Sequence, residues 1–215
     1  MLGRRLLVLT LAIGLPVAGA LAAKAAGYTH GASELATAPF TIDDLDGLRA
    51  TLLLTDEDIG WLRRSRAVLE PHADEILDTW YGFVGANPHL LYYFHDAAGA
   101  ADGEYLARVR ARFRQWILDT ADANYDQAWL DYQYEIGRRH HRVSKNVTDG
   151  VTGPNHIPFR YVVALTYPVT ATLKPFLERG GASPEDVNAM HQAWLKAVLL
   201  QVILWSHPYI IDGDF

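Results

Sequence analysis

The sequence predicts an all-α protein, and two observations support this. Apolar residues recur at helical spacing over several long stretches, and no stretch alternates convincingly between apolar and polar residues as a half-buried strand would. Helix start signals also recur: Thr41 is followed by Asp43 and Asp44, and Ser183 is followed by Pro184 and two acidic residues. With 215 residues, 50% of them hydrophobic, the chain can build one domain with a sizeable core.

Three helices are expected in the first half of the chain. Thr41 caps a short helix marked by Leu45 and Leu48, and the stretch 55–58 resembles a capping box that begins a helix running to about residue 69. Pro71 suits the first turn of the third helix. The 85–88 stretch ends that helix, a short turn is expected at 90–94, and 97–103 reads as a loop. The apolar residues expected to form its buried face are Ile76, Leu77, Trp80, Tyr81 and Val84.

Four longer helices are expected in the second half. The first runs over about 104–118, with Phe113 and Trp116 facing inward, and the second over about 125–143. After a loop at 147–158, a strongly apolar helix over 159–177 is interrupted by Pro168, which removes a backbone donor and should kink it. The last helix, from 183 to about 206, is apolar nearly all round and therefore buried. About eight unequal helices with short loops favour a globin-like packing over a four-helix bundle.

The first residues are typical of a targeting segment. Arg4 and Arg5 precede an apolar stretch over 6–22, and small-residue patterns follow, as in a secretory signal peptide. The stretch is also nearly long enough to be an uncleaved membrane anchor. We therefore predict a signal or anchor segment at 1–23, an extended arm at 24–40 and one domain at 41–215. Export to the periplasm or another extracytoplasmic space is expected; a membrane-anchored or cytoplasmic protein is the alternative.

Composition excludes several classes of site. The absence of cysteine excludes disulfides, cysteine zinc sites and cysteine-ligated iron–sulfur clusters, and a net charge of −6 argues against a nucleic-acid partner. There is no glycine-rich phosphate loop, no Gly-x-Ser-x-Gly nucleophile elbow and no His-Glu-x-x-His zinc helix. No glutamate is followed by a histidine three residues later, so the usual di-iron signature is missing too.

Two adjacent histidines, His140 and His141, lie near the end of an expected helix. Adjacent helical side chains point about 100° apart, so at most one of the two can face the core well. A core-facing imidazole could bind a metal, and without thiolates or paired carboxylates nearby the obvious metal is haem iron, which brings its own equatorial ligands. The alternative is a structural histidine with satisfied hydrogen bonds, which is the role expected of the other seven.

Two further features can be read in two ways. Trp80 and Tyr81 are either aromatic core residues or a polar-tipped wall over a bound ligand. The arginine run at 108–114 is either a solvated helix face or a source of one guanidinium, Arg112, for a haem propionate at a pocket edge.

The chain resembles the protoglobins, single-domain haem proteins related to the sensor domain of globin-coupled sensors. The resemblance runs from residue 27 to residue 215. It is carried by long stretches and not by a short motif, at positions 76–85, 88–94, 112–113, 116–120, 125–137, 140–141, 168–172 and 174–177.

The resemblance implies an expanded globin sandwich with a short helix before the A helix and an N-terminal arm that helps bury haem b. It makes His140 the proximal iron ligand and places Trp80, Tyr81 and Phe113 on the distal side. Phe94 would pack on the haem and Arg112 would contact a propionate. The small G-helix residues Val162, Leu165 and Val169 would line the pocket and widen its distal part.

The implied function is reversible binding of dioxygen, carbon monoxide and nitric oxide at five-coordinate iron. The implied assembly is a homodimer formed through the last two long helices. An alternative is a haem enzyme acting on nitric oxide, nitrite or peroxide with an unknown redox partner, although Tyr81 is a poor substitute for the distal acid–base group of a peroxidase. A helical domain without a cofactor is the third reading.

Overall fold

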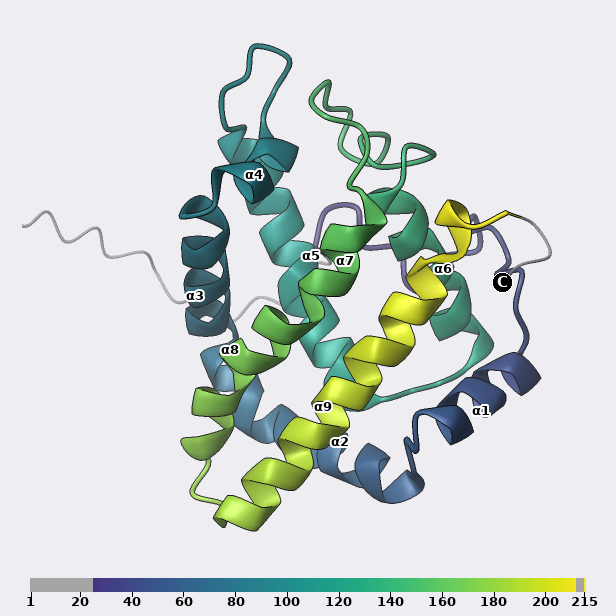
Figure 1. Ribbon diagram of the computed structural model, residues 1–215, viewed down its shortest axis with the longest axis vertical. Coiled ribbons are helices and arrows are strands. Elements are labelled where there is room, and N and C mark those ends of the chain that lie inside the picture. Colours follow the sequence, from purple (N-terminus) through teal and green to yellow (C-terminus); the bar gives the residue numbers. More distant parts are fainter. Residues whose placement is uncertain (1–24, 212–214) are drawn as a thin grey trace, which may run out of the picture.

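Helices make up the framework of the computed structural model, which describes residues 25–211 and residue 215 (Figure 1). The expected signal or anchor segment at 1–23 lies outside these residues. Within them, no helix has the length and apolarity needed to cross a membrane. The α-helices are α1 (Ile42–Thr51), α2 (Asp56–Leu69), α3 (Ala73–Gly85), α4 (Pro88–Leu91), α5 (Gly103–Asp122), α6 (Gln127–His140), α7 (Phe159–Ala164), α8 (Thr166–Glu178) and α9 (Pro184–Trp205). Short 3-10 helices are η1 (Glu70–His72), η2 (Tyr92–Phe94) and η3 (His207–Tyr209).

The predicted helix starts are confirmed at atomic detail. Thr41 and Thr55 each accept a hydrogen bond from the backbone of the residue three positions later, while the carboxylates of Asp44 and Asp58 accept from the backbone of the two threonines. Both ends are complete capping boxes. Ser183 caps α9 in the same way, with Pro184 as the first helical residue.

The apolar helix expected at 159–177 is two helices, and the break lies at Leu165 and not at Pro168. Pro168 has no N–H to donate to the carbonyl of Ala164, so the first helix ends at Ala164. Pro168 then occupies the first turn of α8, where a missing N–H leaves no bond unmade. The expected interruption of the helix is thus present, but it lies one turn before Pro168, the residue that causes it.

Two other helix ends differ from expectation. α5 continues to Asp122, four residues beyond the predicted end at 118, and it ends where Ala123 takes a left-handed conformation. α6 ends at His140 and not at about 143, because His141 is extended with ψ of 159°. The chain therefore turns away immediately after His140 and enters the loop 141–158.

The centre of the molecule is α9, which packs against α2, α6 and α8 (Figure 1). Buried tryptophans dominate this core, and their indole N–H groups are satisfied inside it. Trp116 donates to Gln201 at 2.6 Å and Trp205 donates to Gln133 at 2.8 Å. The third such bond runs from Trp194 to Ser65 at 2.8 Å. These bonds fix how α2, α5 and α6 sit around α9.

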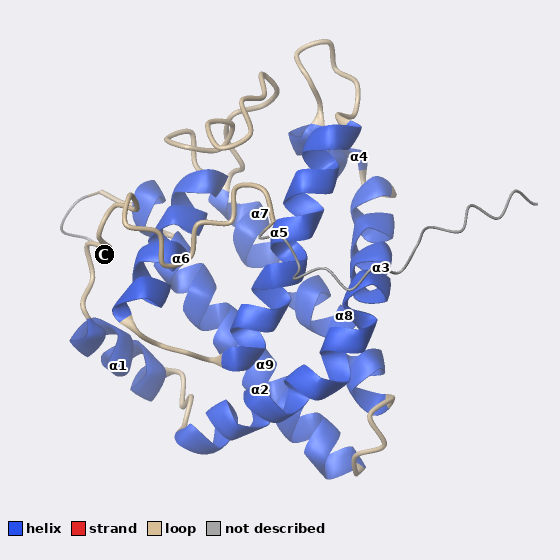
Figure 2. Ribbon diagram, turned by 180° about the vertical axis from the view of Figure 1, so that it is seen from behind, coloured by secondary structure: helices blue, strands red, loops and turns tan. Residues whose placement is uncertain are grey.

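Two close approaches position the site described below. A Cβ on Gly137 would lie 2.9 Å from Cα of Trp205, so α6 crosses α9 backbone to backbone at this glycine. At one end of the molecule, the loops 95–102 and 141–158 project together (Figure 2). They touch where Gly153 meets the carbonyl of His95, with no room for a side chain.

Candidate functional site

A cavity of about 250 Å³ lies among α3, α5, α6, α7, α8 and α9, beneath the 141–158 loop. It is far larger than the occasional water-sized void of a packed core. Its walls are mainly aliphatic and aromatic, with contributions from Val84, Leu90, Val109, Ile136, Ile157, Tyr161, Val198, Val202 and Trp205. Such an enclosed apolar space with a few polar groups is the usual form of a small-molecule or cofactor site.

The structure brings all nine sequence-predicted site residues to this one cavity. They come from five segments of the chain that are far apart in sequence, and each contributes to the lining: Trp80 and Tyr81 from α3, Phe94 from η2, Arg112 and Phe113 from α5, His140 from α6, and Val162, Leu165 and Val169 from α7, α8 and the residue between them. Their shared position is a finding, and their individual roles stay predictions.

His140 is held in one orientation at the end of α6. Its Nδ1 lies 2.8 Å from the carbonyl oxygen of Ile136. A carbonyl can only accept, so Nδ1 carries the proton and Nε2 keeps a free lone pair. The ring stacks on Trp205 with centroids 5.3 Å apart and an interplanar angle of 15°. Burial lowers the pKa of His140, which keeps the imidazole neutral. A neutral imidazole with its second nitrogen fixed by a carbonyl is the usual form of a metal ligand.

His141 is excluded from the cavity by the end of the helix. Its ring packs edge-on against His156 and Tyr209, with centroids 5.2 and 4.9 Å away. Of the histidines that the structure describes, His140 alone lines the cavity. Among all the residues that the structure describes, no group of three or more histidine, aspartate or glutamate side chains could hold a metal ion.

Four aromatic side chains form one connected wall. Phe113 makes edge-on contacts with Trp80 at 5.7 Å and with Tyr81 at 6.5 Å, and Tyr81 meets Phe94 at 6.2 Å. No acceptor among the described residues takes a hydrogen bond from the Tyr81 hydroxyl. Burial raises the pKa of Tyr81 above its ordinary value, so the group stays protonated. The wall thus offers one unused hydroxyl donor.

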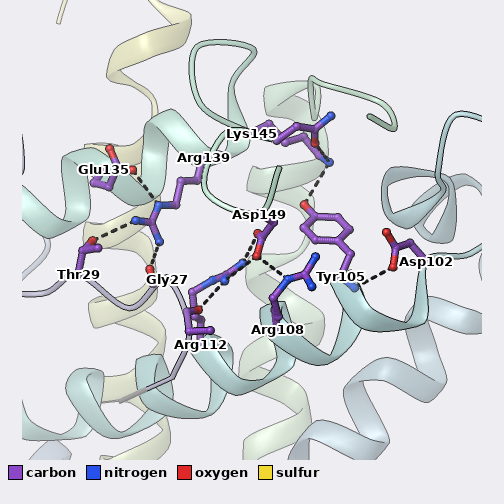
Figure 3. A network of polar contacts seen from close by, with 12 residues as sticks. Gly27, Thr29, Asp102, Tyr105, Arg108, Arg112, Glu135, Arg139, Lys145 and Asp149 are labelled. Carbon is purple, nitrogen blue, oxygen red and sulfur yellow. Dashed lines mark hydrogen bonds and ion pairs between the residues drawn. The ribbon is translucent and has the colours of Figure 1, made fainter. Parts of the chain in front are cut away.

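Charged side chains gather at the mouth of the cavity (Figure 3). Arg112 binds Asp149 through two hydrogen bonds of 3.0 and 2.6 Å, and Arg108 binds the same carboxylate at 3.0 Å. The side chains of Asp149 and Arg112 are 3% and 12% exposed, so this ion pair is mostly buried, whereas Arg108 is 31% exposed. Arg112 therefore lies at the predicted pocket edge, but its guanidinium already has a carboxylate partner.

The N-terminal arm lies along the same edge. Arg112 donates to the carbonyl of Ala26 at 2.8 Å, and Arg139 donates to the carbonyl of Gly27 at 2.7 Å. Arg139 also binds Thr29 at 3.0 Å (Figure 3). Gly27 has a φ of 76°, and a Cβ there would meet Arg112 at 2.9 Å. The arm therefore closes over two of the arginines of the cavity mouth.

Sequence reasoning missed three charged residues of the lining: Arg139, Lys145 and Asp149. Arg139 sits one residue before His140, where helical spacing turns it toward the arm. Lys145 and Asp149 belong to the irregular loop 141–158, and nothing in the local sequence pattern indicates where such side chains point. The contacts that position them come from α5 and η2, which are distant in sequence.

Comparison with known proteins agrees with this picture. A family model described as Protoglobin matches residues 42–214. Among solved structures, the globin domain of the Geobacter sulfurreducens globin-coupled sensor is similar at a TM-score of 0.58 and 17% identity, over 77% of this chain and 97% of that chain. This likeness confirms the predicted globin-like fold. None of the curated proteins matches the chain significantly.

Proposed function

The chain belongs to the protoglobin family, and on that premise we propose that it is a haem-binding globin in which His140 ligates the iron of haem b. The observation that carries the proposal is the state of His140: it is neutral, stacked on Trp205 and held by Ile136, with its free nitrogen lone pair available in the cavity. Bound haem would supply the iron at which dioxygen, carbon monoxide or nitric oxide binds reversibly.

The residues of the cavity fit such a cofactor. Aromatic and aliphatic walls suit the flat apolar macrocycle, and Trp205 stacks against His140 to limit rotation of its ring. Three positive side chains and one negative side chain line the cavity, an excess of two positive charges. Haem b carries two propionates, so the charge at the cavity mouth complements the cofactor.

The polar group best placed to distinguish gases is Tyr81. Its hydroxyl remains protonated and has no acceptor among the described residues, so it can donate to a polar diatomic ligand. Peroxidase chemistry needs a distal acid–base group near neutral pKa. Burial moves the pKa of Tyr81 away from neutrality, which favours gas binding over a haem enzyme acting on peroxide.

The test is removal and replacement of the proposed iron ligand. His140→Gly leaves a gap that free imidazole can fill, so the variant should lose the histidine-ligated ferrous spectrum and regain it on addition of imidazole. His141→Gly is the matched control, since His141 lies outside the cavity, and its spectrum should equal that of the parent protein. A normal spectrum in His140→Gly without imidazole would refute the assignment.

We also propose that the protein forms a homodimer through its last two long helices. These correspond to α8 and α9, which pack against one another. Large apolar side chains remain exposed beside them: Tyr167 at the start of α8 is 77% exposed and Val163 in α7 is 46% exposed. Tyr167→Asp should shift the sedimenting species from dimer to monomer, whereas Leu53→Asp, on an exposed residue elsewhere, should not. Equal behaviour of both variants would contradict this interface.

Export is the third part of the proposal and rests on the sequence of residues 1–23. Mass spectrometry of the protein in separated cell fractions tests it. A mature chain that begins near residue 23 in the extracytoplasmic fraction is expected. An intact chain in the cytoplasmic fraction would contradict it, and an intact chain in the membrane fraction would indicate an anchor.

A further inference from the structure

Lys145 is a buried cation without an anionic partner. It lies in the 141–158 loop, is 4% exposed and lines the cavity. Its ammonium group donates to the carbonyl of Tyr93 at 2.9 Å and to Asn146 at 3.2 Å. It also donates to the hydroxyl of Tyr105 at 3.3 Å (Figure 3). No carboxylate among the described residues lies within 4 Å of it. Burying a charge without a counter-charge is costly, so the position needs an explanation.

The acidic groups of the cavity mouth are already in use. Asp149 is bound by Arg108 and Arg112, and Glu135 is bound by Arg138 and Arg139. The penalty shows in the pKa of Lys145, which burial lowers to about 8 although the more distant Asp149 raises it in part. The positive charge of Lys145 is therefore left over after the internal pairs have formed.

The position of the Lys145 ammonium indicates the role of its positive charge. Its three hydrogen-bond partners come from η2, α5 and its own loop, so the ammonium is fixed at the point where these segments meet above the cavity. The Nζ atom of Lys145 also lies over the ring of Tyr105, 5.2 Å from its centroid. The three N–H donors of the ammonium are all in use, so a carboxylate of the cofactor would replace the longest bond, the one to the Tyr105 hydroxyl. A fixed, buried ammonium at the mouth of an apolar cofactor cavity is suited to this exchange, because a charge-assisted hydrogen bond is stronger than a bond to a neutral hydroxyl.

We propose that Lys145 supplies the ion pair with one haem propionate, while the Arg108–Arg112 pair remains engaged by Asp149. This inference rests on the proposed haem binding. It changes the expectation drawn from the sequence, which gave the propionate contact to Arg112. The reason is that Arg112 already has a bidentate carboxylate partner, whereas Lys145 has no carboxylate partner among the described residues.

The test compares two cofactors in two proteins. Haem dimethyl ester carries two neutral methyl esters where haem has charged propionates, and Lys145→Met removes the ammonium while keeping a long apolar side chain. Release of each porphyrin to an excess of a haem-scavenging apoprotein is timed in parent and variant. Loss of a charge-assisted hydrogen bond should speed haem release about tenfold to a hundredfold. Release of the ester should be nearly the same in both proteins.

Two further variants keep the result interpretable. Lys174→Met, on an exposed lysine of α8, should leave both release rates unchanged. Lys145→Arg retains the positive charge and should preserve the difference in release rate between haem and its ester. This variant keeps the proposal testable if Lys145→Met folds poorly. Equal acceleration of haem and ester release in Lys145→Met, or no acceleration of either, would overturn the proposal. A parent protein that binds neither porphyrin would instead refute haem binding itself.

Discussion

Gly137→Ala perturbs the site through the backbone of Trp205, a residue of the cavity wall, while every side chain of the lining is kept. A Cβ at this position lies 2.9 Å from Cα, 3.0 Å from the carbonyl oxygen and 3.3 Å from the carbonyl carbon of Trp205. Ordinary contact begins near 3.4 Å, so α6 and α9 must separate by about 0.5 Å at their crossing. All three atoms belong to the backbone, and none can rotate away.

The expected size of the effect follows from two opposing contributions. Overpacking costs about 1–3 kcal/mol, and alanine gains about 1 kcal/mol over glycine in a helix. We therefore expect Gly137→Ala to lower the free energy of unfolding by about 1 kcal/mol. Gly60→Ala is the control, because Gly60 lies in α2 with no atom within 4 Å of the added carbon. It should gain about 1 kcal/mol, so the two variants should differ by about 2 kcal/mol.

Urea unfolding of both variants and the parent protein measures this difference. Because Trp205 also stacks on His140, Gly137→Ala should change the ferrous absorption spectrum as well, and Gly60→Ala should not. Equal stabilisation of the two variants would refute the close crossing of α6 and α9. A destabilised Gly137→Ala with an unaltered spectrum would show that the crossing does not position His140.

Three other predictions concern the polar groups of the cavity. Tyr81→Phe removes a hydrogen bond worth about 1 kcal/mol, so stopped-flow mixing should show dioxygen released about fivefold faster. Asp149→Asn leaves the mostly buried Arg112 without a carboxylate, whereas Arg108 keeps a contact with Glu104 at 3.7 Å, and urea unfolding should show a loss of about 3 kcal/mol. Burial lowers the pKa of Lys145 to about 8 from the ordinary 10.5, so the unfolded chain binds more protons above pH 8 and the stability of the cofactor-free protein should rise with pH. The rise attributable to Lys145 should be about 2 kcal/mol between pH 7 and 9.5, and it should be missing from Lys145→Met.

Each of these has a clear contrary result. An unchanged dioxygen off-rate in Tyr81→Phe would remove the hydroxyl from ligand recognition. A stability loss in Asp149→Asn no larger than that of Asp122→Asn, which breaks a half-exposed pair with Arg66, would mean that the cavity cluster is not a buried ion pair. Identical pH profiles in parent protein and Lys145→Met would contradict the lowered pKa of Lys145.

Much of the fold could be predicted from the sequence because the signals involved are local. Capping residues such as Thr41 and Thr55 form their bonds within three residues, and helical periodicity identified the cores of the long helices. The helix breaks at Leu165, one turn before the position that Pro168 predicts, because a proline acts on the carbonyl four residues before it. The early end of α6 at His140 depends on contacts of the following loop with distant residues, which no local pattern contains.

The residues of the candidate site also fall into two groups, those that could be predicted from the sequence and those that could not. Its helical members, from Trp80 to Val169, could be named from the resemblance to a family and lie around one cavity. Lys145 and Asp149 could not, because their positions depend on Tyr93, Tyr105 and two arginines of α5. The residues that sequence alone fails to place are the ones that complete the charge balance at the cavity mouth.

The most direct test of haem ligation by His140 is the visible absorption spectrum of the purified protein, reduced with dithionite, before and after addition of carbon monoxide. A five-coordinate ferrous histidine band that shifts sharply with carbon monoxide is the predicted result. A six-coordinate spectrum that resists carbon monoxide would contradict an open gas-binding site, and a protein without any haem band that also refuses added haem would contradict the account as a whole.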